Sequence, residues 1–252
     1  MVLAWPQRVS DTLTACPIAH LDRFLIAVAK PPGVLSHPNP GSRSTHAAAA
    51  FHGSYDEPSR CFTTPAGKLW LMHRLDQDTS GLLLAARDEG TAQKMRALFE
   101  SKALSKTYLA AVRGQAPASG SWEDHLQSRA SGSSQRGSVI KGRPPNALLH
   151  FKRLAHHAAQ RLSLLQIDLV TGRTHQIRLQ AASRQHPLCG DDVYGDFSMN
   201  RRLRLELGLR RLALHAWRLQ FKHPASGQPM DLRAPLPQDL QQVWQKLDWP
   251  SP

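Results

Sequence analysis

Residues 73–84 of the chain read HRLDQDTSGLLL. An apolar run precedes them at residues 69–72 and another follows at residues 82–86, and both have the length of a short buried strand. The polar part between these runs is typical of a loop, because Asp, Thr and Ser side chains bond their own backbone and glycine tolerates a positive φ. We therefore expect Asp76 on a loop between two strands, a common location for catalytic groups.

The same loop matches the beginning of an EF-hand calcium loop at Asp76, Asp78, Ser80 and Gly81. That calcium loop requires a bidentate Glu at its twelfth position. Counting from Asp76, the twelfth residue is Arg87, a cation, and the flanking runs are strand-like rather than helical. The sequence therefore excludes a calcium site of this type.

The 252-residue chain is strongly basic. Its 32 Lys and Arg residues outnumber 19 Asp and Glu residues, which gives a formal net charge of +13. The shares of hydrophobic residues (41%) and charged residues (20%) are ordinary for a soluble globular protein. A positive field attracts polyanions, and nucleic acid is the commonest of them. The alternative is a protein that is merely basic, but Arg residues in all regions of the chain favour nucleic acid.

Several other classes of protein are excluded by the sequence. The three cysteines, Cys16, Cys61 and Cys189, are far apart and form no CxxC pair, which argues against a disulfide framework or a thiolate zinc site and fits a reducing cytosol. The 13 histidines form neither an HExxH pattern nor a finger-like pattern. No apolar run has the ~20 residues of a membrane span, and we see no signal peptide. We expect a cytoplasmic protein without a membrane partner.

The hydrophobic pattern predicts an α+β fold. Strands are expected at residues 24–29, 69–72, 82–86, 105–112, 162–170, 214–221 and 230–233, the last two joined as a hairpin. Helices are expected at residues 45–51, after Asp88, after an N-cap at Thr174, within residues 201–211 and around residues 240–247. The remaining segments are predicted to be a loose lead-in at residues 1–22, a loop at 54–67, and an extended, basic, partly mobile region at 115–145. Because strands outnumber helices, the sheet should be mixed or mainly antiparallel.

Asp76 would lie among leucines, where a carboxyl group stays protonated unless a cation is near. Arg74 and Arg178 are candidates for that cation, which would keep the carboxylate nucleophilic or basic. The spacing alone slightly favours a structural turn with a surface salt bridge over this catalytic interpretation.

Two further segments carry side chains that could bind nucleic acid. Tyr108 could stack on a base, although its position in a strand favours the core. Near the predicted helix start, Arg173 and Gln176 share a face by their spacing, as do His175 and Arg178. A helix N-terminus with added cations suits phosphate, and the alternative is a solvated face. No phosphate loop or GxGxxG motif is present.

Five segments together resemble the RluA-type family of RNA pseudouridine synthases. They are, in chain order, residues 30–33 with 37–38 (KPPG and HP), 73–84 (HRLD and TSGLLL), 106–108 (KTY), 171–178 (TGRTHQIR), and 186–191 with 194–195 (HPLCGD and YG). Each motif alone is only suggestive. Five in the family's order, between residues 24 and 236, make coincidence a poor explanation.

The resemblance implies a pseudouridine synthase core, with a mixed, mainly antiparallel sheet, flanking helices and a basic RNA-binding cleft. It implies an isomerase that converts uridine in ribosomal or transfer RNA to pseudouridine, without a metal or organic cofactor. Asp76 would be the essential carboxylate, Arg178 its ion-pair partner, and Tyr108 the ring stacked on the target uracil. Arg74 would enter the space left by the flipped base. We expect the other polar motif residues to contact the RNA: His73, Thr79, Arg173, His175 and Gln176.

Residues 1–22 are too few for the separate RNA-binding module that many relatives carry. We therefore expect one catalytic domain at residues 23–252, acting as a monomer. Two other functions remain open. A non-catalytic RNA-binding protein of the same fold would not need Asp76, Tyr108 and Arg178 together, and a hydrolase that uses Asp with His73 or His175 lacks a convincing metal or nucleophile pattern.

Overall fold

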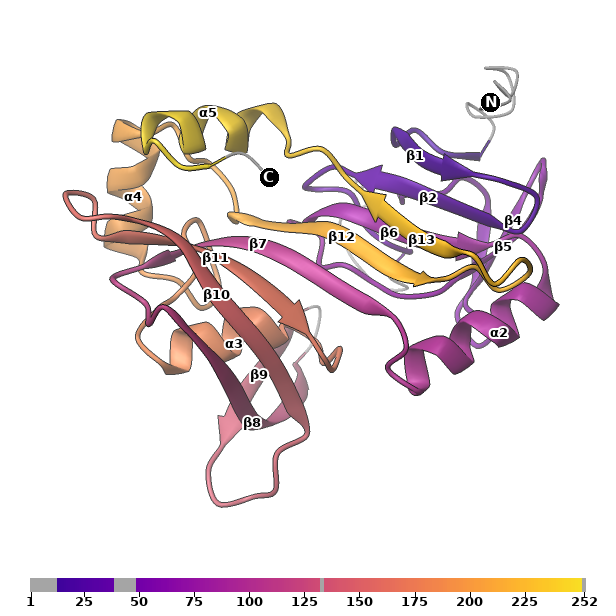
Figure 1. The fold of residues 1–252 in the computed structure, drawn as a ribbon, viewed down its shortest axis with the longest axis horizontal. Helices are drawn as coiled ribbons and strands as arrows, with labels where there is room; N and C mark the ends of the chain where they lie inside the picture. Colours follow the sequence, from indigo (N-terminus) through magenta and orange to yellow (C-terminus); the bar gives the residue numbers. More distant parts are fainter. Residues whose placement is uncertain (1–12, 39–48, 132–133, 251–252) are drawn as a thin grey trace. The chain divides into compact units, whose positions relative to one another are not determined.

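The computed structural model describes residues 13–38, 49–131 and 134–250. Their contacts divide the chain into two compact units (Figure 1). The first unit comprises residues 1–104 and 218–235, and the second unit comprises residues 105–217 and 236–252. The expected boundary between residues 22 and 23 stays a prediction.

The first unit is built on antiparallel strands. They are β1 (Ile18–Leu21), β2 (Leu25–Lys30), β3 (Ser54–Asp56), β4 (Cys61–Thr64), β5 (Gly67–Leu71) and β6 (Ser80–Ala86). The pairing order is β3-β4-β5-β6-β2-β1. Helix α2 (Glu89–Glu100) follows β6, and the end of β12 (Leu214–Lys222) pairs with β13 (Pro229–Arg233) as a hairpin.

Strand β6 explains why the first unit folds around the quoted stretch. All seven of its residues are buried, and it pairs with β2 over residues 81–86 and with β5 at Ala85 and Ala86. A continuous apolar run suits a strand that is covered on both faces. Leu82 and Leu84 pack with Leu25 of β2 and Met95 of α2 in one core cluster.

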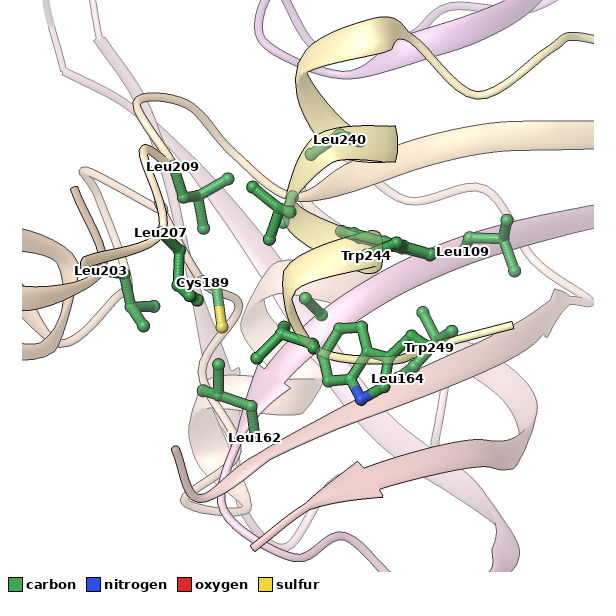
Figure 2. Packing of buried hydrophobic residues seen from close by; sticks show 14 of the residues in the cluster. Leu109, Leu162, Leu164, Cys189, Leu203, Leu207, Leu209, Leu240, Trp244 and Trp249 are labelled. Carbon is green, nitrogen blue, oxygen red and sulfur yellow. The ribbon is translucent and has the colours of Figure 1, made fainter. Parts of the chain in front are cut away.

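In the second unit the strands pair in the antiparallel order β7-β11-β10-β8-β9. Its strands are β7 (Ser105–Arg113), β8 (Ser119–Ser131), β9 (Ser134–Ile140), β10 (Ala147–His157) and β11 (Leu162–Leu169). Its helices are α3 (Gln176–Ser183), α4 (Phe197–Glu206) and α5 (Gln238–Lys246). Figure 2 shows its main core, where Leu240 and Trp244 of α5 join a cluster with Leu109 and Leu164 of the strands.

Most expected elements are confirmed. The strands at residues 24–29, 69–72, 82–86, 105–112 and 162–170 correspond to β2, β5, β6, β7 and β11, and the C-terminal hairpin and helix to β12, β13 and α5. Asp88 caps α2 by accepting a hydrogen bond from the Thr91 N–H, as its position predicted. The helical part expected within residues 201–211 belongs to α4, which begins earlier, at Phe197.

Other expectations were wrong. Residues 54–67, predicted as a loop, contribute to β3, β4 and β5, and residues 18–21 of the lead-in form β1. The region 115–145 is extended in part, as expected, but its extended parts are the paired strands β8 and β9, which the sequence did not predict, and β10 was not expected at all. These strands carry many polar residues, and pairing with neighbours rather than local pattern decides such strands. Of the helix expected at residues 45–51, residues 45–48 lie outside the described part, and residues 49–51 are not helical.

Candidate active site

The loop with Asp76 lies between β5 and β6 in the first unit, as the sequence predicted. The Thr79 N–H donates to the Asp76 carbonyl oxygen at 3.1 Å and closes a turn. Arg74 is exposed, Asp76 is half-buried, and Thr79 is buried. The loop therefore carries the cation Arg74 shortly before a closed turn that begins at the carboxylate Asp76.

A buried ammonium group holds this loop to the turn after β2. Lys30 is only 1% exposed, and its Nζ donates to the carbonyl oxygens of Val34 (2.7 Å), Gln77 (2.9 Å) and Pro31 (3.0 Å). The Gly33 N–H also donates to the Gln77 carbonyl at 2.9 Å. Gly33 has a φ of +82°, a conformation that glycine adopts without strain. Lys30 thus fixes the backbone directly after Asp76.

We expect Lys30→Met to lower the free energy of unfolding by about 1–3 kcal/mol, because an apolar tip removes the three hydrogen bonds that the buried ammonium group donates. Urea denaturation measures this change. Lys94→Met on the exposed face of α2 is the matched control and should change stability by no more than about 0.5 kcal/mol. Equal stabilities for the two variants would contradict the structural function of the Lys30 ammonium.

The residues that flank Arg74 are also held by specific bonds. His73 Nε2 accepts the Leu84 N–H at 3.1 Å, so this nitrogen carries no proton in that bond. The Ser36 hydroxyl accepts the Leu75 N–H (2.9 Å) and donates to the Leu75 carbonyl (2.8 Å). Contact of His73 and Thr79 with RNA stays a prediction, since these bonds lie within the chain.

In the second unit, Arg178 forms a buried ion pair with Asp191. Its Nε lies 2.8 Å from Asp191 Oδ2 and its Nη2 lies 2.9 Å from Asp191 Oδ1, with 5% of Arg178 and 1% of Asp191 exposed. Asp191 also accepts the backbone N–H groups of Val193 and Tyr194. Burial raises the pKa of Asp191, but the bonds from Arg178 and the backbone outweigh it and hold the pKa below its ordinary value.

The pair with Asp191 is a finding that the sequence did not predict. Asp191 belongs to the HPLCGD motif, but its spacing from Arg178 follows no helical or strand period, so no local signal indicated the contact. The expected pairing of Arg178 with Asp76 stays a prediction. A guanidinium group has five N–H donors, of which the bidentate pair with Asp191 uses two.

Residues 171–175 form the approach to α3 rather than its first turn, so the helix faces expected to be shared by Arg173 with Gln176 and by His175 with Arg178 do not exist. His175, with a φ of +54°, is the N-cap position in place of Thr174, and its side chain does not cap the helix. His175 Nδ1 lies 2.9 Å from the Tyr194 hydroxyl. The helix begins at Gln176 because a left-handed residue cannot continue a right-handed helix.

Gln176 is 3% exposed, and both the oxygen and the nitrogen of its side-chain amide form hydrogen bonds within the chain. Its Oε1 accepts from the Thr171 hydroxyl (2.8 Å) and the Arg173 N–H (3.1 Å), and its Nε2 donates to the Leu148 carbonyl (3.1 Å). Gln176 therefore shapes the loop that presents Arg173, which is exposed. Direct contact of Gln176, Arg173 and His175 with RNA stays a prediction.

Tyr108 lies in β7 opposite Ile167 of β11 and is 7% exposed. The structure places His73, Arg74, Asp76 and Thr79 in the first unit, and Tyr108 with Arg173, His175, Gln176 and Arg178 in the second unit.

Within the described ranges, no group of three His, Cys, Asp or Glu side chains could hold a metal ion. None of the helices described has the length and apolar character needed to cross a membrane.

Comparison with known proteins shows which family the chain resembles. Residues 24–183 match the family described as RNA pseudouridylate synthase. The chain is 35% identical over 218 residues to ribosomal large subunit pseudouridine synthase C of Escherichia coli (strain K12), covering 82% of this chain. It is 33% identical over 239 residues to ribosomal large subunit pseudouridine synthase D of Zymomonas mobilis, covering 90% of this chain. The chain spans 65% of the length of the first relative and 71% of the second.

Solved structures agree on the fold. Human RNA pseudouridylate synthase domain containing 4 has a TM-score of 0.67 at 22% identity, over 93% of this chain and 94% of that one. Human RNA pseudouridylate synthase domain containing 1 has a TM-score of 0.64 at 22% identity, over 99% and 100%. The α+β fold with a mixed, mainly antiparallel sheet, expected from the motifs, is confirmed.

Proposed function

Because the chain belongs to the RNA pseudouridylate synthase family, we propose that it isomerises uridine in RNA to pseudouridine, as the motif resemblance predicted. One observation carries this proposal. The region that matches the family, residues 24–183, contains Asp76, Tyr108 and Arg178, the three residues to which the motif resemblance assigns catalytic roles.

The target uridine must first leave the RNA structure, since its reacting atoms are otherwise inaccessible. Extruding a nucleotide costs a few kcal/mol. Stacking of the uracil on Tyr108 would offset about 1–3 kcal/mol of this cost. Arg74, exposed on its loop, would enter the vacated space and contact base and phosphate.

The isomerisation breaks the bond between C1′ and N1, rotates the uracil, and forms a bond between C1′ and C5. The hydrogen on C5 leaves as a proton, and N1, released from C1′, takes up a proton, so that the product is an isomer of uridine. Asp76 is the proposed carboxylate, and it could add to the pyrimidine ring, attack the sugar, or abstract a sugar proton. Each path requires the ionised form, which an ion pair with Arg178, the proposed partner, would favour.

We place the enzyme in the cytoplasm as a monomer that acts on ribosomal RNA. The names of the relatives refer to the large ribosomal subunit, which supports this substrate, and transfer RNA is the next to be tested. The formal net charge of +13 supports binding of a polyanion through a basic surface. No metal or organic cofactor has a part in the proposed chemistry.

Release of tritium from RNA labelled at C5 of uracil tests the proposal, because this hydrogen is lost only when the new carbon–carbon bond forms. We expect release from ribosomal RNA without added metal. An absence of release from both ribosomal and transfer RNA, with binding detected, would replace the proposal by a non-catalytic RNA-binding function.

A further inference from the structure

We propose that His37 is a positioning residue that orients the guanidinium group of Arg74 for entry into the RNA. This inference rests on the proposed function of Arg74. His37 follows β2 in the motif KPPGVLSHP, and Arg74 lies in the loop between β5 and β6. Both belong to the first unit, and their side chains meet at 3.3 Å between Arg74 Nη1 and His37 Nε2.

The neighbours of the imidazole determine which nitrogen accepts this bond. His37 Nδ1 lies 3.0 Å from the Pro38 carbonyl oxygen. A carbonyl oxygen can only accept, so the proton of a neutral imidazole lies on Nδ1. Nε2 is then unprotonated and accepts a hydrogen bond from Arg74, because a guanidinium group has N–H donors but no acceptor atom. Glu57 Oε2, 3.5 Å from Nδ1, favours the same assignment.

The imidazole ring is itself held rigidly. His37 is 8% exposed and stacks on the Tyr55 ring, with 5.0 Å between centroids and 21° between planes. Tyr55 packs against Phe62 at 4.7 Å, and Phe62 packs against Phe51 at 5.7 Å. An acceptor on a rigid ring can therefore direct the exposed, rotatable Arg74 side chain before RNA arrives. Such preorganisation reduces the entropy that is lost on binding.

The competing explanation is that the His37 ring only packs against Tyr55 and does not orient Arg74. Two variants distinguish these explanations. His37→Phe keeps an aromatic ring for stacking but has no acceptor. His37→Gln gives up the ring but can place an amide oxygen near the position of Nε2. Positioning predicts that Gln rescues what Phe loses, whereas a packing function predicts the reverse.

We expect His37→Phe to lower kcat/KM for tritium release about tenfold, the effect of one hydrogen bond to a charged group. His37→Gln should recover most of this loss, although its thermal stability falls further than that of His37→Phe. In an Arg74→Ala background, His37→Phe should have no further effect, because the two changes remove the same interaction. Full activity of His37→Phe, or an undiminished tenfold loss in the Arg74→Ala background, would overturn the proposal.

The same variants keep the inference separate from the proposed function. RNA affinity, measured by filter binding, requires no isomerisation. If the wild type releases no tritium, the proposed function fails, and coupling between His37 and Arg74 is read from affinity instead. Coupling in affinity would support the positioning function, and independent effects of the two residues on affinity would refute it.

Discussion

Asp76→Asn should reduce tritium release from RNA labelled at C5 of uracil by roughly 10³-fold or more, the scale seen when a principal catalytic group is removed. The substitution removes the negative charge on which each proposed path depends. It should leave the fold intact, because Asn has nearly the same size as Asp and the backbone bond from the Thr79 N–H to the carbonyl of residue 76 is kept. Single-turnover rates with excess enzyme measure the loss directly.

Asp78→Asn is the matched control for this experiment. Asp78 lies two residues further along the same loop, is exposed, and has no proposed function in the reaction. The control should release tritium at close to the wild-type rate, with a similar unfolding temperature for both variants. Undiminished release by Asp76→Asn would show that another carboxylate carries the reaction.

The second large effect concerns stability. Arg178→Met should lower the free energy of unfolding by about 3–5 kcal/mol, because it leaves the carboxylate of Asp191 buried without its partner. Adding Asp191→Asn should restore part of the loss, since an amide oxygen can still accept the N–H groups of Val193 and Tyr194. Urea denaturation of the single and double variants measures both changes.

An exposed ion pair in the same unit provides the control. Arg202→Met breaks the pair between Arg202 and Glu206 (3.3 Å), in which both side chains are more than 40% exposed. We expect this change to cost no more than about 1 kcal/mol, because solvent screens exposed charges. Similar losses for Arg178→Met and Arg202→Met would contradict the importance of burial for the pair with Asp191.

The effect of Arg178→Met should also depend on pH. In the wild type, burial opposes ionisation of Asp191, but Arg178 holds its pKa below the ordinary value. A depressed pKa stabilises the folded state above the unfolded-state value of about 3.9, and this contribution is lost as the pH falls. The difference in stability between wild type and variant should therefore shrink below about pH 4. If the stability difference between wild type and variant did not change with pH, Asp191 would be excluded as the source of that difference.

Local patterns in the sequence were sufficient for much of this protein. The leucine run determined β6, Asp88 marked the start of α2, and the spacing of Leu240, Val243 and Trp244 indicated α5. These signals depend on neighbours within one strand or two helical turns, where periodicity and capping act. The order of the motifs predicted the family, and the polar residues between two apolar runs predicted the loop position of Asp76, since both are properties of the linear chain.

Only the tertiary structure decided which distant groups support those motifs. Lys30 meets the carbonyl of Gln77, His37 meets Arg74, and Arg178 meets Asp191, pairs that are 47, 37 and 13 residues apart. The polar strand β10 likewise depends on its pairing with β8 and β11. Such contacts follow from strand register and loop closure. A hydrogen bond between separate segments leaves no period in the sequence, so the candidate catalytic loop could be predicted while the bonds that hold it could not.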